Sequence, residues 1–387
     1  MKKFTLYNYW RGPSLLLLTL YLFFAGCKKI SIDKDDLRNF QQVNLVANSG
    51  AYAPVLTDGS LLNAWGLAWS PTRIAWVNSH DGHVSELYTE AGGIVRPPVH
   101  IPSPTDTIGG QPTGIVFAGG AGFKLANSQG ALFLFAGEDG VLSGWNGAAG
   151  NNALRIADNS ASAHYTGLAL TTNNGSHLLY AANFKSGKID VWDTTFTAVS
   201  LPFHDPFLPS GYAPFNIQAV GSWLFVAYAK VGPDGDEQPG AGLGFVDIFN
   251  PDGSFLRRFA SKGTLNAPWD VTITPAGFLD DHDMTDENGK MKNEDQGGKD
   301  KMKGKPDDDQ QPVILVGNFG DGKINVYSVA GQFLGQLQSH NHTIVIEKLW
   351  ALSFAPVTAT NTDQSRLYFT AGPNDENDGL FGYLIRN

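Results

Sequence analysis

The stretch Val316–Leu337, VGNFGDGKINVYSVAGQFLGQL, decides the fold of this chain. Its residue types predict two short strands joined at Gly322, followed by a third strand after Gly331, with apolar and polar residues alternating along the strands. A related pattern occurs earlier at Ala182–Trp192, ANFKSGKIDVW. The chain therefore contains an internal repeat, and the fold has to be worked out from that repeat.

Six copies of the repeat can be followed along the chain. Each opens with a small apolar strand, continues with an aromatic-rich second strand and reaches a turn glycine. The opening strands are Trp65–Ala68, Thr113–Val116, Thr166–Ala169, Asn216–Ala219, Trp269–Thr272 and Trp350–Ser353. The turn glycines, Gly82, Gly140, Gly187, Gly244, Gly322 and Gly379, are separated by 58, 47, 57, 78 and 57 residues. Four short strands in about 40–50 residues is the period of a propeller blade.

The two ends of the repeat array predict how the fold closes. After Gly379 only Leu380–Asn387 remain, which is enough for a third strand of the last blade but not for a fourth. The isolated strand Gln42–Ala47 can complete that blade and cover an open sheet edge. We therefore predict an all-β protein, a six-bladed β-propeller over residues 41–387 closed by its N-terminal strand. The longest interval contains residues 280–311, a Lys/Asp/Gly-rich stretch that we expect to be a disordered charged insertion.

The N-terminus predicts export and a lipid anchor. Basic residues precede an apolar run, Leu15–Phe24, that is shorter than the ~20 residues of a membrane-spanning helix. The following residues, Phe24-Ala25-Gly26-Cys27, resemble a bacterial lipobox, in which the cysteine becomes the lipidated first residue. We predict a lipoprotein signal peptide at 1–26, lipidation of Cys27 and a tether at 27–40. The alternative is an ordinary cleaved signal with an incidental cysteine.

Cysteine count and charge narrow the class of protein further. Because Cys27 is the only cysteine, an intramolecular disulfide framework is excluded. Three of the 27 Lys and Arg residues and none of the 37 acidic residues lie in 1–26, which leaves 24 basic residues and a net charge of −13. Such an acidic chain is a poor nucleic-acid binder. We expect a monomer at the cell envelope, held at the outer membrane through Cys27 and facing either the periplasm or the surface.

The opening strand of each propeller blade lines the central channel, so its first residues are the candidate binding site. Flat aromatic faces beside amide and hydroxyl groups suit a small polar ligand such as a sugar or a peptide. The alternative is that the tryptophans wedge between blades and the polar groups satisfy strand-end backbone. The candidates are Asn63, Trp65, Gln111, Thr113, His164, Thr166, Phe215, Asn216, Trp269, Asp270, Lys348 and Trp350.

A metal-dependent hydrolase of lactonase or esterase type is the alternative function. Some six-bladed enzymes of that type hold a divalent cation in the channel, where it activates water or polarises a carbonyl. Oxygen ligands for Ca or Mg could come from Asn63, Asn216, Asp270 and Glu347. However, no acid occupies the equivalent position in the first three blades. We therefore predict no cofactor and keep the divalent cation as the alternative.

Other polar segments favour structural roles. The pairs His80/His83 and His340/His342 lack a nearby cysteine or carboxylate set typical of zinc sites, which favours isolated surface histidines. Gly232–Gly242, GPDGDEQPGAG, is most simply a flexible excursion from the fourth blade. No nucleophile elbow, P-loop or dinucleotide-binding motif is found at a strand-to-helix junction.

Five segments together resemble an uncharacterised family of exported bacterial proteins, which is related in repeat style to NHL-type six-bladed propellers. They are Asn63–Ala68, Gly211–Ile217, Leu265–Trp269, Gly317–Gly322 and Phe369–Glu376. The resemblance covers nearly the whole mature chain and implies the fold and export, but no activity. The charged insertion and the lipobox depart from the family's simplest form. The leading hypothesis is a lipid-anchored, non-enzymatic binding or scaffold propeller that recognises a glycan, peptide or protein partner.

Overall fold

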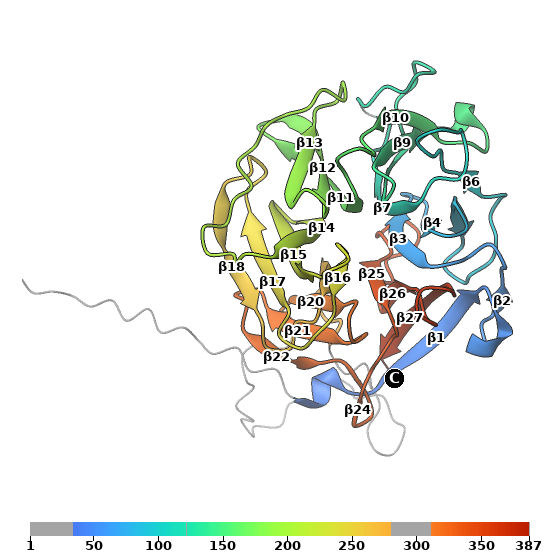
Figure 1. Ribbon diagram of the computed structural model, residues 1–387. Helices are drawn as coiled ribbons and strands as arrows, with labels where there is room; N and C mark the ends of the chain where they lie inside the picture. Colours follow the sequence, from blue (N-terminus) through green and yellow to red (C-terminus); the bar gives the residue numbers. More distant parts are fainter. Residues whose placement is uncertain (1–33, 121, 280–310, 387) are drawn as a thin grey trace, which may run out of the picture. The chain divides into compact units, whose positions relative to one another are not determined.

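Six sheets form the blades of a ring within the compact unit Ser31–Asn387 (Figure 1). The computed structural model describes residues 34–120, 122–279 and 311–386 of the 387-residue chain. The predicted signal peptide, Cys27 and the predicted insertion, except its last residue Gln311, lie outside the described residues. In those three described ranges, no helix is both long enough and apolar enough to cross a membrane.

The first three blades follow one another along the chain. Blade one contains β3 (Ala64–Trp69), β4 (Ala75–Ser79), β5 (Val84–Tyr88) and β6 (Val99–His100). Blade two contains β7 (Pro112–Phe117), β8 (Phe133–Gly137), β9 (Val141–Trp145) and β10 (Leu154–Asp158). Blade three contains β11 (Tyr165–Asn173), β12 (Ser176–Asn183) and β13 (Lys188–Trp192).

The second half of the ring repeats this order, and its last blade takes in the N-terminus. Blade four contains β14 (Tyr212–Val220), β15 (Trp223–Val231), β16 (Glu237–Gln238), β17 (Gly244–Phe249) and β18 (Phe255–Ser261). Blade five contains β19 (Pro268–Ile273), β20 (Val313–Asn318), β21 (Ile324–Ser328) and β22 (Phe333–Gln336). Blade six contains β25 (Leu349–Phe354), β26 (Arg366–Ala371), β27 (Leu380–Arg386), β1 (Phe40–Ala47) and β2 (Leu56–Thr57).

Short elements lie outside the blade strands. They are the 3₁₀ turns η1 (Lys34–Leu37), η2 (Gly50–Tyr52) and η3 (Gly147–Ala149), and the hairpin of β23 (Gln338–Ser339) and β24 (His342–Thr343). The innermost blade strands contact one another in the order β3, β7, β11, β14, β19, β25 and back to β3. This closed circuit confirms the predicted six-bladed β-propeller.

The predicted closure by the N-terminal strand is also confirmed. Strand β1 pairs antiparallel with β27 over its whole length, from Phe40 opposite Arg386 to Ala47 opposite Leu380. This pairing satisfies the edge of β27, which would otherwise be open to another chain.

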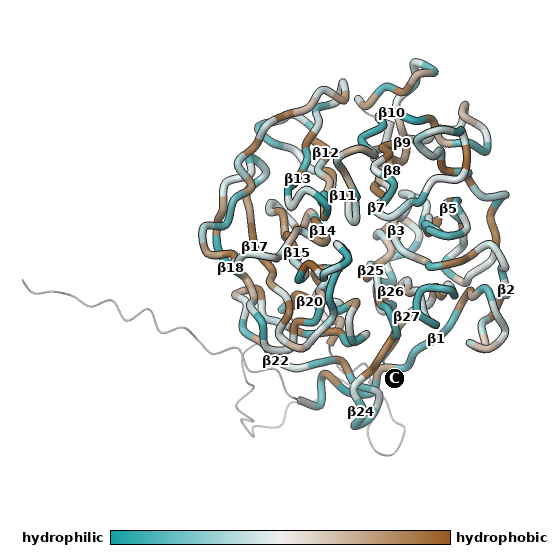
Figure 2. Tube along the Cα trace, viewed as in Figure 1, coloured by the Kyte–Doolittle hydropathy of each residue, from teal (hydrophilic) through white to brown (hydrophobic). Residues whose placement is uncertain are grey.

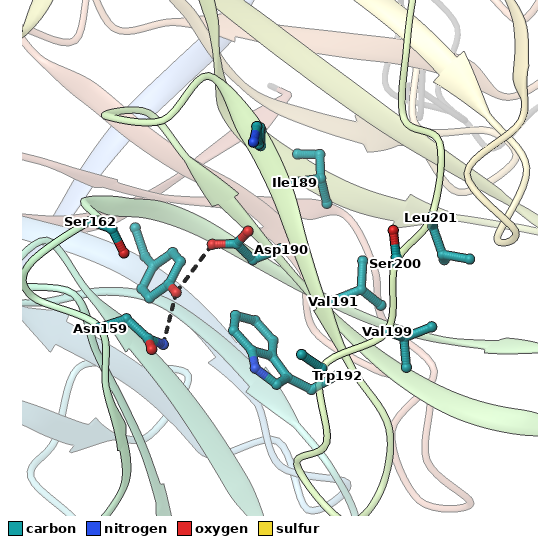
Figure 3. A pocket seen from close by; sticks show the side chains of 12 residues that line it. Asn159, Ser162, Ile189, Asp190, Val191, Trp192, Val199, Ser200 and Leu201 are labelled. Atoms are coloured by element: carbon teal, nitrogen blue, oxygen red, sulfur yellow. Dashed lines mark hydrogen bonds between the residues drawn. The ribbon is translucent and has the colours of Figure 1, made fainter.

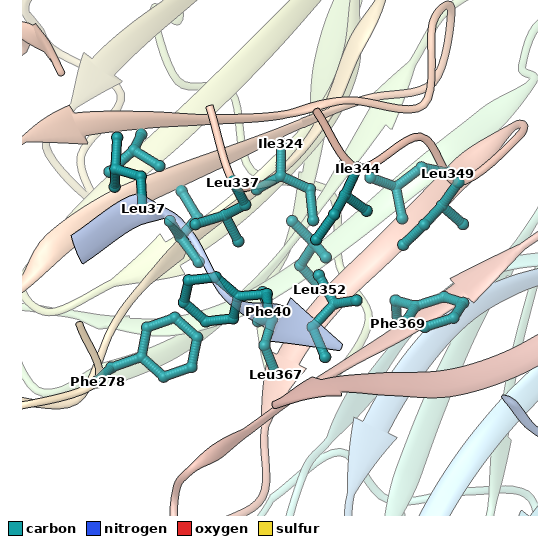
Figure 4. Close-up of a cluster of buried hydrophobic side chains, with 14 of the residues drawn as sticks. Leu37, Phe40, Phe278, Ile324, Leu337, Ile344, Leu349, Leu352, Leu367 and Phe369 are labelled. Atoms are coloured by element: carbon teal, nitrogen blue, oxygen red, sulfur yellow. The ribbon is translucent and has the colours of Figure 1, made fainter. Parts of the chain in front are cut away.

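Apolar residues just before β1 strengthen the closure. Leu37 and Phe40 are 4% and 1% exposed and belong to the apolar cluster shared by blades five and six (Figure 4). The rings of Phe40 and Phe278 lie 5.4 Å apart. The packed structure therefore includes residues before position 41.

The polar groups of the hairpin between β20 and β21 are structural. Asn318 Nδ2 donates to the Thr264 carbonyl at 2.7 Å and to Asp321 Oδ1 at 2.9 Å. Gly322 has a φ of 67°, and a Cβ there would lie 2.2 Å from the Ile346 carbonyl oxygen, so the turn requires glycine. These residues hold the blade together.

The ladder register shifts at one equivalent place in every innermost strand, as it does at a β-bulge. The first residues within the shift are Trp65, Thr113, Thr166, Phe215, Trp269 and Trp350. Bulges re-aim side chains. In this protein they help to place one residue from each blade near the centre of the ring.

Candidate functional site at the channel mouth

Aromatic side chains close the centre of the ring. The rings of Trp65 and Trp350 stack at 3.6 Å, and those of Phe319 and Trp350 lie 4.2 Å apart. Phe215 and Trp269 join the same cluster, and all five residues are at most 3% exposed. We call these five residues the aromatic plug. The predicted aromatic faces are thus packed against one another, and the plug forms the floor of the channel mouth.

Hydrogen bonds fix two tryptophans of the plug. Trp350 Nε1 donates to Asn63 Oδ1, and Trp269 Nε1 donates across the ring to the Thr166 carbonyl, both at 2.9 Å. Trp65 Nε1 is buried and has no hydrogen-bond partner among the described residues. Two of the three indoles therefore have satisfied polar groups and behave as core side chains.

The polar candidates beside the plug are also buried. Thr113 is 0% exposed, and its hydroxyl contacts the carbonyls of Ala136 and Tyr165 at 3.0 and 2.5 Å. Asn216 is 1% exposed, and its Oδ1 accepts from the Ile217 amide. Its Nδ2 has no partner within the described part of the chain. These side chains support the inner strands.

The four candidate metal ligands have different environments. Asp270 is 2% exposed and accepts from the Leu352 amide, and burial raises its pKa to about 7. Glu347 is exposed and accepts from the Asp375 amide at 3.4 Å. Across residues 34–120, 122–279 and 311–386, no group of three His, Cys, Asp or Glu side chains is arranged to hold a metal ion.

The other predicted candidates lie just before the bulged residues, on the outer side of the plug. Gln111, His164 and Lys348 are half-buried, and Asn63 is 2% exposed. Asn63 and Lys348 have φ values of 45° and 52°, in the left-handed region that non-glycine residues seldom adopt. Such backbone persists only where the surroundings hold it, and it is concentrated at functional sites.

Ionisable side chains from four blades gather at this mouth. They are His80, Glu138, Asp236, Glu237, Lys348 and Glu376, which we call the mouth cluster. Contacts with the plug place it next to the floor. The His80 ring lies 5.3 Å from that of Trp65, and Lys348 Nζ lies 4.5 Å over the ring of Phe319.

His80 is the most enclosed charged group of the mouth cluster. It is 5% exposed, and its Nδ1 and Nε2 contact Asp81 Oδ1 at 2.8 Å and Glu138 Oε2 at 2.9 Å. Burial opposes protonation, but the two carboxylates outweigh it and raise the pKa of His80 to about 9. The prediction of an isolated surface histidine is therefore wrong for His80, because the ring fold brings Glu138 to it from blade two.

A second ion pair lies on the blade-six side of the mouth. Lys348 Nζ contacts Glu376 Oε1 at 3.2 Å and Asp375 Oδ1 at 3.4 Å. Asn63 Nδ2 donates to the other oxygen of Glu376 at 3.3 Å. Burial raises the pKa of Glu376, although Lys348 and Asn63 act in the opposite direction.

The segment predicted as a flexible excursion from blade four is a structured hairpin at the mouth. Its strand β16 pairs with β15, with Lys230 opposite Gln238. It lies near the centre of the ring in Figure 1, and its tube is mostly hydrophilic in Figure 2. The hairpin carries Asp236, which interacts electrostatically with Glu138 and His164.

Glu237 extends the cluster from this hairpin toward blade six. It interacts electrostatically with Glu376, Lys348 and Asp236, and burial raises its pKa to about 8. Carboxylates outnumber cations in the mouth cluster, so this side chain has an environment that disfavours its charge. A cation placed next to Glu237 would stabilise its ionised form.

A groove of about 430 Å³ continues outward from the cluster between blades three and four. Its lining includes His164, Phe184, Lys185, Tyr212 and Asp236. Asp236 belongs both to this lining and to the mouth cluster, and His164 interacts electrostatically with Glu138, so the groove adjoins the cluster.

Sequence reasoning found Asn63, His164 and Lys348 but missed the hairpin residues of the site. His80 and Glu138 directly follow the second strands of blades one and two, and Phe184 and Phe319 stand at the matching places of blades three and five. Comparing these equivalent positions around the repeat could have indicated His80 and Glu138. Nothing local indicated Glu237, because its contacts come from a distant blade.

Comparisons with known proteins bring no activity to the site. No family model matches the chain. Uncharacterised protein L690 of Acanthamoeba polyphaga mimivirus is 29% identical over 372 residues, which cover 89% of this chain and 86% of that protein. Uncharacterised protein R648 of the same virus is 27% identical over 364 residues, covering 89% and 80%. Both relatives are viral, so the resemblance to exported bacterial proteins stays a prediction.

Solved propeller structures resemble the chain only distantly. The alignment with a streptogramin B lyase covers 90% of this chain and 97% of the lyase chain, with a TM-score of 0.48 and 12% identity. The alignment with a gluconolactonase from Xanthomonas campestris covers 84% of this chain and 86% of the gluconolactonase chain, with a TM-score of 0.45 and 13% identity. The choice between a binding protein and an enzyme therefore rests on the residues of the channel mouth.

Proposed function

We propose that this protein is a binding propeller of the cell envelope, anchored through a lipid on Cys27, whose ligand site is the channel mouth. The ligand presents an ammonium group, as a peptide lysine or an amino sugar does. The observation that carries the proposal is the gathering of four carboxylates, Glu138, Asp236, Glu237 and Glu376, next to the aromatic plug and beside the groove.

The charge balance supports an ammonium ligand. The mouth cluster has four carboxylates against His80 and Lys348, and burial raises the pKa of three of the carboxylates, Asp236, Glu237 and Glu376. An ammonium group placed among them would stabilise their ionised forms and donate charge-assisted hydrogen bonds to them. The groove is of a size typical of small-ligand sites.

Ligand binding should be coupled to the release of a proton. With a pKa of about 8, Glu237 holds a proton at neutral pH in the free protein. A bound ammonium group favours the carboxylate, so binding expels that proton. Affinity then rises with pH between about 6 and 8, by at most about tenfold per pH unit.

The test uses two probe pairs in which acetylation of one nitrogen removes the positive charge. The first is N-acetyl-lysine amide and its Nε-acetylated form, and the second is glucosamine and N-acetylglucosamine. Calorimetric titration should detect binding of at least one ammonium probe with a dissociation constant below about 1 mM. Its acetylated counterpart should bind at least about tenfold more weakly, because it lacks the charge. Equal binding within both pairs, or no binding of either ammonium probe, would refute the proposal.

Variants assign the binding to the mouth. Glu376→Gln and Glu138→Gln should each weaken the ammonium probe by about tenfold or more. Asp106→Asn is the matched control, because Asp106 is an exposed carboxylate in a loop of blade one and does not belong to the mouth cluster. Loss of affinity in the control as well would place the site elsewhere.

Membrane attachment is tested separately. Cys27→Ser should release the chain from the membrane fraction of cells that process lipoproteins, because lipidation requires the thiol. Continued membrane retention of this variant would contradict the anchor without bearing on the channel mouth.

Turnover of lactones or esters that requires a divalent cation and is abolished in Asp270→Ala would instead establish the hydrolase alternative.

A further inference from the structure

Blade three differs from the other blades at its outer edge. Its sheet ends with β13, whereas the sheets of the other five blades have a further strand outside their third strand, as far as the described residues show. The fourth position, next to the third strand, is held by β6, β10, β18, β22 and β1 in those five blades. The edge of β13 is therefore the place where a strand can be added to the ring.

The chain that follows β13 starts to form a fourth strand and then turns away. The Val199 amide donates to the Val191 carbonyl at 2.8 Å, and Trp192 is bridged to Ala198. Beyond this point Leu201 packs into the apolar cluster of blades three and four. The chain is thus drawn toward blade four, and the first half of β13 is left without a neighbour.

A groove of about 350 Å³ results between β13 and the departing segment (Figure 3). One side is lined by Lys188, Ile189 and Asp190 and the other by Ser200 and Leu201. Figure 3 shows Val191 beside Val199, where the departing segment is still hydrogen-bonded to β13. Along Lys188–Asp190 no backbone hydrogen bond joins the two segments in the described part of the chain.

The backbone of Ile189 faces this groove. In an antiparallel sheet, residues two apart direct their N–H and C=O groups to the same neighbour. Because the Val191 carbonyl accepts from Val199 on the outer side, the N–H and C=O groups of Ile189 also point outward. No backbone partner for them is found on that side in the described part of the chain. They are a free donor and acceptor at a sheet edge, which an extended peptide can use.

Charge indicates the chemistry of that peptide. Lys188 is exposed and forms no ion pair with any described residue. Asp190, on the same strand, already accepts from Asn183 Nδ2 at 2.8 Å and from the Tyr165 hydroxyl at 3.2 Å. The unmatched charge at the edge is therefore positive, and an acidic side chain is complementary to it.

We propose that the edge of β13 docks a short extended segment of a partner protein, which carries an acidic residue opposite Lys188 and adds to blade three as its missing fourth strand. Main-chain hydrogen bonds to Ile189 supply the register, and a side chain of the segment enters the groove beside Leu201. Only the first half of β13 is free, so the contact is short and its dissociation constant is on the order of 100 µM.

The test selects peptides from a random twelve-residue phage-display library on the wild-type protein and compares each with Ile189→Pro. This substitution removes the outward N–H but leaves the ladder to β12, since proline is tolerated at a sheet edge when its nitrogen faces outward. Ile189→Val keeps the N–H and is the matched control. Selected peptides should contain Asp or Glu between β-branched residues and bind Ile189→Pro at least about tenfold more weakly than wild type or Ile189→Val.

Charge reversal keeps the test decisive if the proline variant does not fold. Lys188→Glu should weaken the selected acidic peptides by several-fold and strengthen their lysine-substituted forms. The proposal is overturned if no selected peptide discriminates against Ile189→Pro or Lys188→Glu. It is also overturned if the purified protein is a dimer that Ile189→Pro converts to a monomer, because a second copy would then occupy the edge.

Discussion

Replacing Trp350 with alanine removes the centre of the aromatic plug. Trp350 is 0% exposed and stacks on Trp65 at 3.6 Å. Truncating a fully buried tryptophan costs about 3–5 kcal/mol in the free energy of unfolding. The change also deprives Asn63, 2% exposed, of the donor on its Oδ1, which adds about 1 kcal/mol or more. The expected loss of about 4–6 kcal/mol is a large part of the stability of an ordinary domain.

Urea unfolding followed by far-ultraviolet circular dichroism measures this loss through the shift in midpoint at an unchanged slope. Trp223→Ala is the matched control, because Trp223 is 48% exposed and should cost less than about 1 kcal/mol. Trp350→Phe keeps most of the volume and should cost about 1–3 kcal/mol, so it serves if the alanine variant does not fold. Equal losses for Trp350→Ala and Trp223→Ala would refute the plug as a core element.

Three further predictions follow from the same contacts. Because carboxylates outweigh burial and raise the pKa of His80 to about 9, its charge should stabilise the fold fully below about pH 6.5, and that stability should be lost as pH rises through about 9. The loss is at most about 3 kcal/mol and should be absent in His80→Gln, as unfolding measured from about pH 6 to 10 will show. Because burial raises the pKa of Asp270 to about 7, its ionisation costs stability above about pH 4 and most above pH 7. Asp270→Asn should therefore gain stability over wild type at about pH 8 but much less at about pH 4, and an equal effect at both pH values would contradict the assignment. A chain lacking residues 34–47 leaves the edge of β27 unpaired and should give no cooperative unfolding transition, whereas a wild-type melting curve would contradict closure by β1.

The fold could be predicted because its signals are local and repeated. Turn glycines such as Gly322 and the alternation around them recur in each blade, and the lone strand before the first blade had one open edge to fill. Placing the bulged residues at the channel followed from the same repeat. The burial of Trp65 and Trp350 could not be predicted in this way. The sequence does not show whether the side chains that point into the channel are together large enough to fill it.

The mouth cluster could be predicted only in part, because its contacts join residues far apart in the chain. His80 meets Glu138 58 positions later, and Glu237 interacts with Glu376 across the ring. The residues around Glu237 have the composition of a loop, and its role depends on the hairpin of β15 and β16. His80 and Glu138 at least stand at equivalent positions of the repeat, whereas the interaction of Glu237 with Glu376 leaves no periodic signal in a single sequence.

The central claim is that the channel mouth binds an ammonium group with release of a proton from Glu237. Calorimetric titration with N-acetyl-lysine amide at about pH 6 and pH 8 tests it most directly, because the lysine ammonium stays charged at both values. The account predicts that affinity rises by about tenfold or more between these pH values in the wild-type protein, and that Glu237→Gln abolishes this rise. Binding with the same affinity at both pH values, or with the same pH dependence in Glu237→Gln, would contradict it.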